Sequence, residues 1–72
     1  MSEDREQFSV YQEYSTGFGE YVRRLVSAQE AVRAFHQYTH AISARSGAIV
    51  RVLITDGGDR VVREWRDGVT LP

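Results

Sequence analysis

The chain has 72 residues, nine basic and ten acidic side chains, a formal net charge of −1 and no cysteine. A chain this short buries only about 60% of its unfolded surface, which predicts one small hydrophobic core and no deep catalytic pocket. The absence of cysteine excludes disulfides, thiolate nucleophiles and cysteine-ligated zinc. The near-zero charge provides no general attraction to nucleic acid or to membranes.

The first seven residues, MSEDREQ, are polar and acidic, and we expect residues 1–7 to be disordered. A secretory signal would start with basic and then apolar residues. No apolar run approaches the ~18 residues that span a bilayer. These features predict a cytoplasmic protein without a membrane partner, folded as a single domain over residues 8–72.

Two segments near the N-terminus predict a β-hairpin. Residues 8–14 (FSVYQEY) and 20–26 (EYVRRLV) alternate apolar with polar side chains and are rich in aromatic and β-branched types. A turn at residues 16–17 places Glu13 opposite Glu20. Two like charges there indicate an exposed strand end rather than a general acid and base.

The next segment predicts an amphipathic helix over residues 28–46. Ser27 and Glu30 have the spacing of a capping box, and Gly47 stands where a left-handed C-cap is favoured. At 100° per residue one apolar arc is expected to lie on the sheet. This arc contains Ala31, Val32, Ala34, Phe35, Tyr38, Ala41 and Ile42.

The second half of the sheet is predicted at residues 48–56 (AIVRVLITD) and 60–65 (RVVREW). If Gly57 and Gly58 form a type I′ turn, the facing pairs are Ile54 with Val61, Arg51 with Glu64 and Val50 with Trp65. These pairings explain the glycines without a ligand, whereas calcium needs about six to eight oxygen ligands. A turn is therefore predicted here, rather than a metal or phosphate site.

The element order ββαββ predicts an α+β fold, with a four-stranded, mainly antiparallel sheet and one helix packed on one face. The strand orders 2-1-3-4 and 1-2-3-4 both remain open. The face under the helix is expected to hold Phe8, Val10, Tyr14, Tyr21, Leu25, Val50, Val52, Ile54, Val61 and Trp65. The opposite face is expected to hold Tyr11, Val22, Val26, Ile49, Leu53 and Val62 among charged residues.

The stretch EYVRRLVSAQEAVRAFHQYTH, followed by ITDGGD and EW, resembles a group of small uncharacterised bacterial proteins of ββαββ organisation. The resemblance covers most of the chain. It implies the same order of elements, but no activity and no functional residue is carried over from it.

The apolar residues on the open sheet face predict a protein-interaction module, because a sizeable exposed apolar patch rimmed by charge is typical of a binding surface. The partner is expected to be a second copy of the chain or a larger protein. The proposed contact residues are Tyr11, Val22, Arg24, Arg51, Leu53, Val62 and Glu64. The alternative is nucleic-acid binding, with Tyr11 stacking on bases and strand arginines pairing with phosphates.

Neither an enzyme nor a resident cofactor is predicted. No serine has a base and an orienting group at recognisable spacing. His36 and His40, four residues apart on a helix, can bind a transition metal only if a third ligand is added, and this remains open.

Overall fold

The computed structural model describes residues 7–71, so, of residues 1–7 that were expected to be disordered, residues 1–6 lie outside the described range. The elements are β1 (Phe8–Tyr14), β2 (Gly19–Val26), α1 (Ala28–Thr39), α2 (Ile42–Arg45), β3 (Ile49–Thr55), β4 (Val61–Arg66) and β5 (Val69–Leu71). Within these residues the strands form one antiparallel sheet in the order β2-β1-β3-β4-β5. The α+β class is confirmed, and the order 2-1-3-4 is the one adopted.

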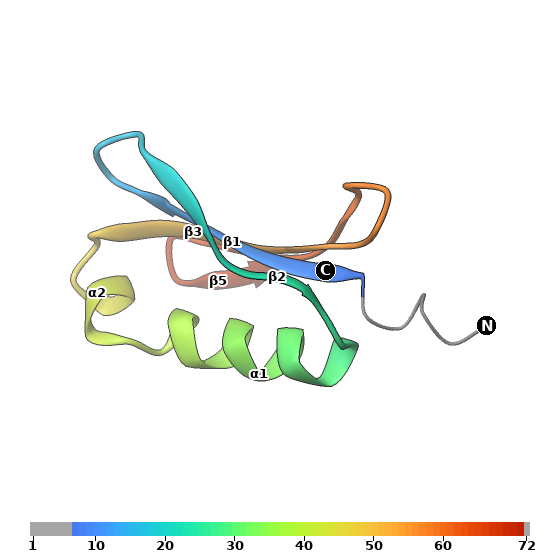
Figure 1. Cartoon of the computed structure of the whole chain (residues 1–72). Helices are drawn as coiled ribbons and strands as arrows, with labels where there is room; N and C mark the ends of the chain where they lie inside the picture. Colours follow the sequence, from blue (N-terminus) through green and yellow to red (C-terminus); the bar gives the residue numbers. More distant parts are fainter. Residues whose placement is uncertain (1–6, 72) are drawn as a thin grey trace.

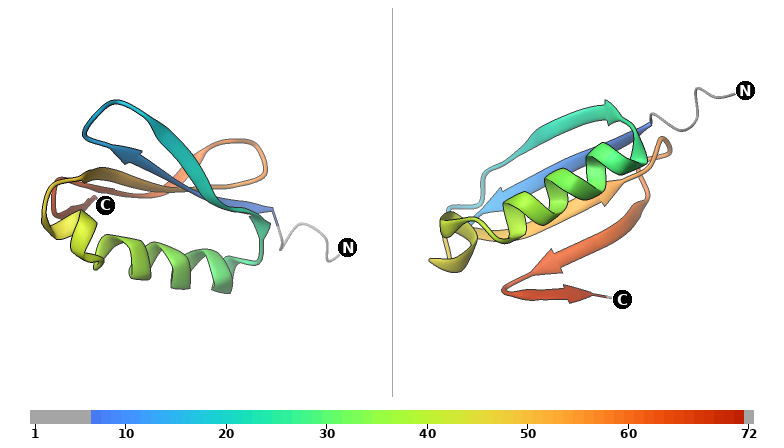
Figure 2. Two further views of the ribbon diagram at one scale, coloured as in Figure 1. Left: turned by 60° about the vertical axis from the view of Figure 1, so that its left-hand side comes forward. Right: turned by 90° about the horizontal axis from the view of Figure 1, so that it is seen from below.

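The molecule has two layers, the sheet and the helices (Figure 1). Helix α1 lies over β1 and β3 and runs roughly along them, while β4 and β5 extend beyond it (Figure 2). The core lies between these layers. Val10 and Val52 are fully buried there, and Phe35 and Trp65 are each 6% exposed. Burial of Trp65 confirms the core position predicted for it.

Helix α1 begins as predicted, because the Ser27 hydroxyl accepts a hydrogen bond from the Glu30 backbone N–H at 3.2 Å. The prediction of a continuous helix to residue 46 is wrong. After Thr39 the backbone becomes extended at Ala41, and only a four-residue helix, α2, follows. A 19-residue helix would be about 28 Å long, whereas the seven-residue strands span about 23 Å. The break returns the chain to the sheet, and it leaves Ile42 82% exposed instead of packed on the core.

The first hairpin differs from the predicted register by one residue at its turn. Its loop has three residues and ends in Gly17 in the left-handed region (φ 99°), with Tyr14 N–H donating to the Phe18 carbonyl. A one-residue slip exchanges the two faces of a strand, so Tyr21 lies opposite Tyr11 on the open side instead of facing the core. Two further register shifts follow, between Tyr11 and Val10 and between Val10 and Phe8. The predicted faces are wrong for four β2 residues: Val22 and Val26 pack on the core, and Tyr21 and Leu25 are exposed.

The second hairpin also has a three-residue loop, not the predicted type I′ turn. Gly57 and Gly58 do not have positive φ; Asp59 does (φ 63°), and the Asp56 carboxylate accepts the Gly58 and Arg60 backbone N–H groups. The slip carries Val61 onto the open face. None of the three expected facing pairs forms in the observed register, in which Arg51 faces Arg66 and Val52 faces Trp65, although the Arg51 side chain still reaches Glu64.

A β-bulge at Val62 restores the faces of β4. Opposite β3, the register shifts by a second residue between Val61 and Arg63, so Val52 pairs with Trp65 and Leu53 with Glu64. A total shift of two residues leaves side chains on their predicted faces, because the period of a strand is two. Trp65 therefore points into the core although its partner was predicted incorrectly.

A fifth strand, β5, was not predicted. Asp67 (φ 51°) and Gly68 (φ 94°) both have positive φ between Arg66 and Val69, which pair with each other. This is the geometry of a type I′ turn, which Asp-Gly favours. The four-stranded prediction is corrected accordingly for the described residues.

Replacing Trp65 with alanine is expected to lower the free energy of unfolding by about 3–5 kcal/mol, because removal of a large buried ring leaves a cavity. Urea unfolding followed by circular dichroism measures this change. Trp65→Phe retains an aromatic ring and should cost less. An unfolding midpoint for Trp65→Ala equal to that of the parent would contradict the core position of the indole.

Candidate functional site

The face of the sheet turned away from α1 is called the open face. The strand pairing aligns two rows of residues across it, because directly paired residues project to the same side of a sheet. One row is Tyr21, Tyr11, Leu53, Glu64 and Leu71, and the other is Gly19, Glu13, Arg51, Arg66 and Val69.

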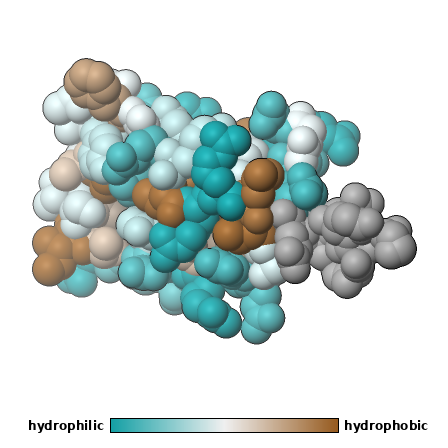
Figure 3. Space-filling model, viewed as in Figure 1, coloured by the Kyte–Doolittle hydropathy of each residue, from teal (hydrophilic) through white to brown (hydrophobic). Residues whose placement is uncertain are grey.

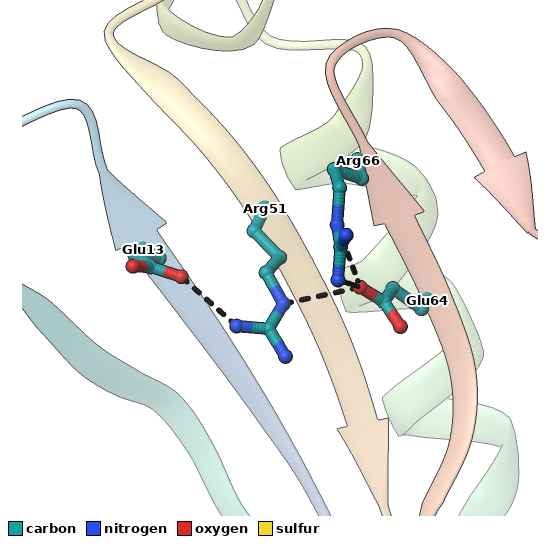
Figure 4. Close-up of polar contacts among 4 residues, drawn as sticks. All are labelled: Glu13, Arg51, Glu64 and Arg66. Carbon is teal, nitrogen blue, oxygen red and sulfur yellow. Dashed lines mark hydrogen bonds and ion pairs between the residues drawn. The ribbon is translucent and has the colours of Figure 1, made fainter.

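Four charged side chains from three strands form one network on this face, called the Arg51 network (Figure 4). Arg51 donates from Nη1 to Glu13 Oε1 and from Nε to Glu64 Oε2, each at 3.1 Å. Arg66 donates to the same Glu64 oxygen, at 2.7 Å from Nη2. The network joins β1, β3 and β4 and has a net charge of zero.

The network also changes the acidity of its members. Partial burial tends to raise the pKa of the Glu64 carboxyl, but the Arg66 and Arg51 guanidinium groups outweigh this effect and hold that pKa below its usual value. Partial burial tends to lower the pKa of Arg51, yet its hydrogen bonds to Glu13 and Glu64 outweigh burial and raise it. Both groups are therefore charged at neutral pH.

Beside the network lies a cluster of Tyr11, Tyr21 and Arg24. The two rings meet edge to face with centroids 5.1 Å apart, and the Arg24 guanidinium carbon lies 4.3 Å from the Tyr21 ring centroid. Gly19 is required here because the Tyr11 ring fills the space that a Cβ at position 19 would occupy. Edge-to-face packing is favourable because the positive edge of one ring meets the negative face of the other.

The structure brings five of the seven predicted contact residues together on the open face. These are Tyr11, Arg24, Arg51, Leu53 and Glu64. Val22 packs against the core, and Val62 occupies the bulge in β4, where it is 53% exposed.

The open face is less apolar than predicted. Val26 and Ile49 face the core, and Leu53 is only 8% exposed although it lies outside the core cluster. The exposed apolar groups instead surround the Arg51 network, with Tyr21 on one side, Val61 beyond one end and Val69 on β5. On the side of the molecule seen in Figure 3, hydrophobic side chains likewise form separate patches between hydrophilic ones.

The acidic pair expected across the first hairpin does not form. Glu13 pairs with Gly19, and Glu20 pairs with Gln12. The Tyr14 hydroxyl donates to Glu20 at 2.6 Å, and this hydrogen bond raises the pKa of Tyr14. A phenol held by a carboxylate in this way is a structural contact rather than an acid poised for proton transfer near neutral pH.

The two histidines stack instead of converging on a common point. Their ring centroids are 4.2 Å apart and tilted by 31°, and the Nδ1 atom of His40 contacts the His36 carbonyl at 2.8 Å. Among residues 7–71 no three metal-binding side chains come together. The described geometry therefore provides no third ligand for the pair.

A groove on the helix side of the sheet was missed by sequence reasoning. It has a volume of about 570 Å³ and lies between the α2 segment and the β4–β5 hairpin. Apolar side chains of Ala44, Ile49 and Trp65 contribute to its lining. The Asp67-Gly68 dipeptide was the available signal, because it predicts the hairpin that forms one wall.

Comparisons of the chain with protein-family models, with curated proteins and with solved structures found no match. In the part of the chain that the structure describes, neither helix is long and apolar enough to cross a membrane.

Replacing Glu64 with glutamine is expected to destabilise the fold at pH 7 and to have little effect near pH 2. The folded-state pKa of Glu64 lies below its unfolded value of about 4.3, so its charge contributes stability above that pH. The contribution is lost as the pH falls through the folded-state pKa, where the carboxyl becomes protonated. Urea unfolding of both proteins at the two pH values measures the difference.

Glu30→Gln is the matched control, since Glu30 forms a longer, more exposed pair with Arg23 (3.8 Å). Exposed pairs contribute little stability, so this substitution should change little at either pH. An equal effect of Glu64→Gln at both pH values would show that the charge of Glu64 is not what stabilises the network.

Proposed function

We propose that this chain is a protein-interaction module that self-associates, with the open face of one copy packed against the open face of another. The observation that carries the proposal is the cluster of Tyr11, Tyr21 and Arg24 on a sheet face that no described element covers. Tyrosine and arginine are the residue types enriched at the energetic centres of protein interfaces.

The charge pattern of the face suits a second copy of the same chain. The Arg51 network contains two arginines and two glutamates, and it is bordered by exposed apolar groups such as Tyr21 and Val69. In a twofold symmetric interface the same patch meets itself, so a patch carrying both charge signs can be self-complementary. A patch of one sign would repel its copy.

The size of the core also favours association. Among the core side chains that are fully buried, the largest are only valines, Val10 and Val52. Small domains of this kind gain stability by burying further surface against a partner. A standard interface buries about 800 Å² per partner, which is roughly a sixth of the 4907 Å² accessible surface of the chain.

Nucleic-acid binding has less support from the same residues. Arg51 and Arg66 are paired with carboxylates, and Arg60 pairs with Asp56 at 3.3 Å. A phosphate would have to compete with these carboxylates, so the strand arginines supply less free positive charge than their number suggests.

Sedimentation of the purified chain at increasing concentration tests self-association. We expect a monomer–dimer equilibrium that Tyr21→Ser weakens by about tenfold or more, because truncation of a central aromatic contact is costly. Ile42→Ser is the matched control, since Ile42 is 82% exposed on α2, in the helix layer. It removes an exposed apolar side chain without changing the open face.

A monomer at high micromolar concentration would contradict self-association and leave a different protein as the partner to be sought. Dimerisation that Ile42→Ser weakens and Tyr21→Ser does not would place the interface on the helix side instead.

A further inference from the structure

The groove between the α2 segment and the β4–β5 hairpin lies on the side of the sheet opposite the open face. One wall comes from His40 and from α2 with its C-terminal residues, including Arg45. The other wall comes from Asp67, Gly68 and Thr70 of the hairpin. Trp65 is 6% exposed and Ile49 is 3% exposed at this groove, so both are largely buried by the protein and held in fixed positions.

The two walls carry opposite charges that are not paired. Neither Arg45 nor Asp67 forms an ion pair within residues 7–71, whereas five other arginine–carboxylate pairs occur in the same part of the chain. Both residues line the same groove. The groove therefore offers one unpaired charge of each sign, which suits a ligand that carries both signs.

The hairpin wall is held in place by the backbone. The Asp67 N–H donates to the Val50 carbonyl at 3.0 Å, and Asp67 and Gly68 occupy the two positive-φ positions of the turn. A carboxylate on a short hydrogen-bonded turn loses little conformational freedom when it binds a cation. This fixed position favours recognition of an ammonium group.

The helical wall also carries an imidazole. The Nδ1 atom of His40 lies 2.8 Å from the His36 carbonyl, which only accepts hydrogen bonds, so Nδ1 is the donor in this contact. His40 and Arg45 therefore place an imidazole and a cation on the same side of the groove.

We propose that this groove binds a small zwitterion with an apolar side chain, namely a free amino acid or a dipeptide. Its carboxylate pairs with Arg45, its ammonium group pairs with Asp67, and its apolar side chain lies beside Ile49 and Trp65. The groove volume of about 570 Å³ falls within the range of about 300–1,000 Å³ typical of small-molecule sites.

The test uses Trp65, which is the only tryptophan of the chain. L-leucine, L-phenylalanine and leucyl-leucine are titrated into the full chain, and the indole N–H resonance and the fluorescence of Trp65 are followed. The free amino acids and the dipeptide differ in the distance between their two charges. Their relative affinities therefore show whether the groove prefers a free amino acid or a dipeptide. We expect saturable binding with a low-millimolar dissociation constant or tighter, since both charges are open to water.

Two variants and two analogues test the charge recognition. Arg45→Gln and Asp67→Asn should each weaken binding by about tenfold, the size expected for loss of a charge-assisted hydrogen bond. Asparagine tolerates the positive φ of position 67 (51°), so that variant should fold normally. Arg33→Gln, on exposed α1 surface outside the groove, is the matched control and should bind as the parent does.

Acetylation of the amino group or amidation of the carboxyl group of phenylalanine should weaken binding to a similar extent. The proposal is overturned if Trp65 does not respond to any zwitterion. It is also overturned if blocked and free ligands bind equally well, or if Arg45→Gln and Arg33→Gln behave alike. A failure of self-association through the open face would leave these results unchanged, because the groove lies on the other side of the sheet.

Discussion

A single α-helix is about 10 Å wide and strands are about 4.8 Å apart, so one helix covers roughly two strands of a sheet. In this protein α1 covers β1 and β3, near the middle of the sheet. The core is therefore centred on Val10 and Val52, with Trp65 at its margin. What the helix does not cover is the open face and, on the helix side of β4 and β5, the groove beside the largely buried Trp65.

The two uncovered surfaces differ in how their charges are satisfied. On the open face Arg51 and Glu64 meet within a hydrogen-bonded network, so the charges stabilise the sheet and leave aromatic groups for contact. In the groove Arg45 and Asp67 line the same space, and neither forms an ion pair within the described residues. Paired charges in the first case favour a protein surface as partner, and unpaired charges in the second favour a small ligand of matching polarity.

Loop length and β-bulges together decided which residues belong to which face. The β1–β2 and β3–β4 hairpins both have loops of three residues where two-residue turns were predicted, and the extra residue moves the side chains next to the loop to the other face. In β2 this places Tyr21 opposite Tyr11 on the open face, and two further register shifts along the pair accompany the packing of Val22 and Val26 on the core. In β4 the bulge at Val62 compensates for the slip, which is why Trp65 returns to the core.

The sequence by itself determined the class of fold, the positions of both long hairpins, the N-cap of the helix and the burial of Trp65. These depend on local composition, on capping chemistry and on the two-residue period of a strand, because a register shift of two residues leaves each side chain on its predicted face. Only the tertiary structure decided the end of α1, the face of Tyr21 and the placement of Arg45 and Asp67 at one groove. These depend on how far one helix extends along the sheet and on which strands it leaves uncovered, and neither quantity is encoded in the pattern of any single segment.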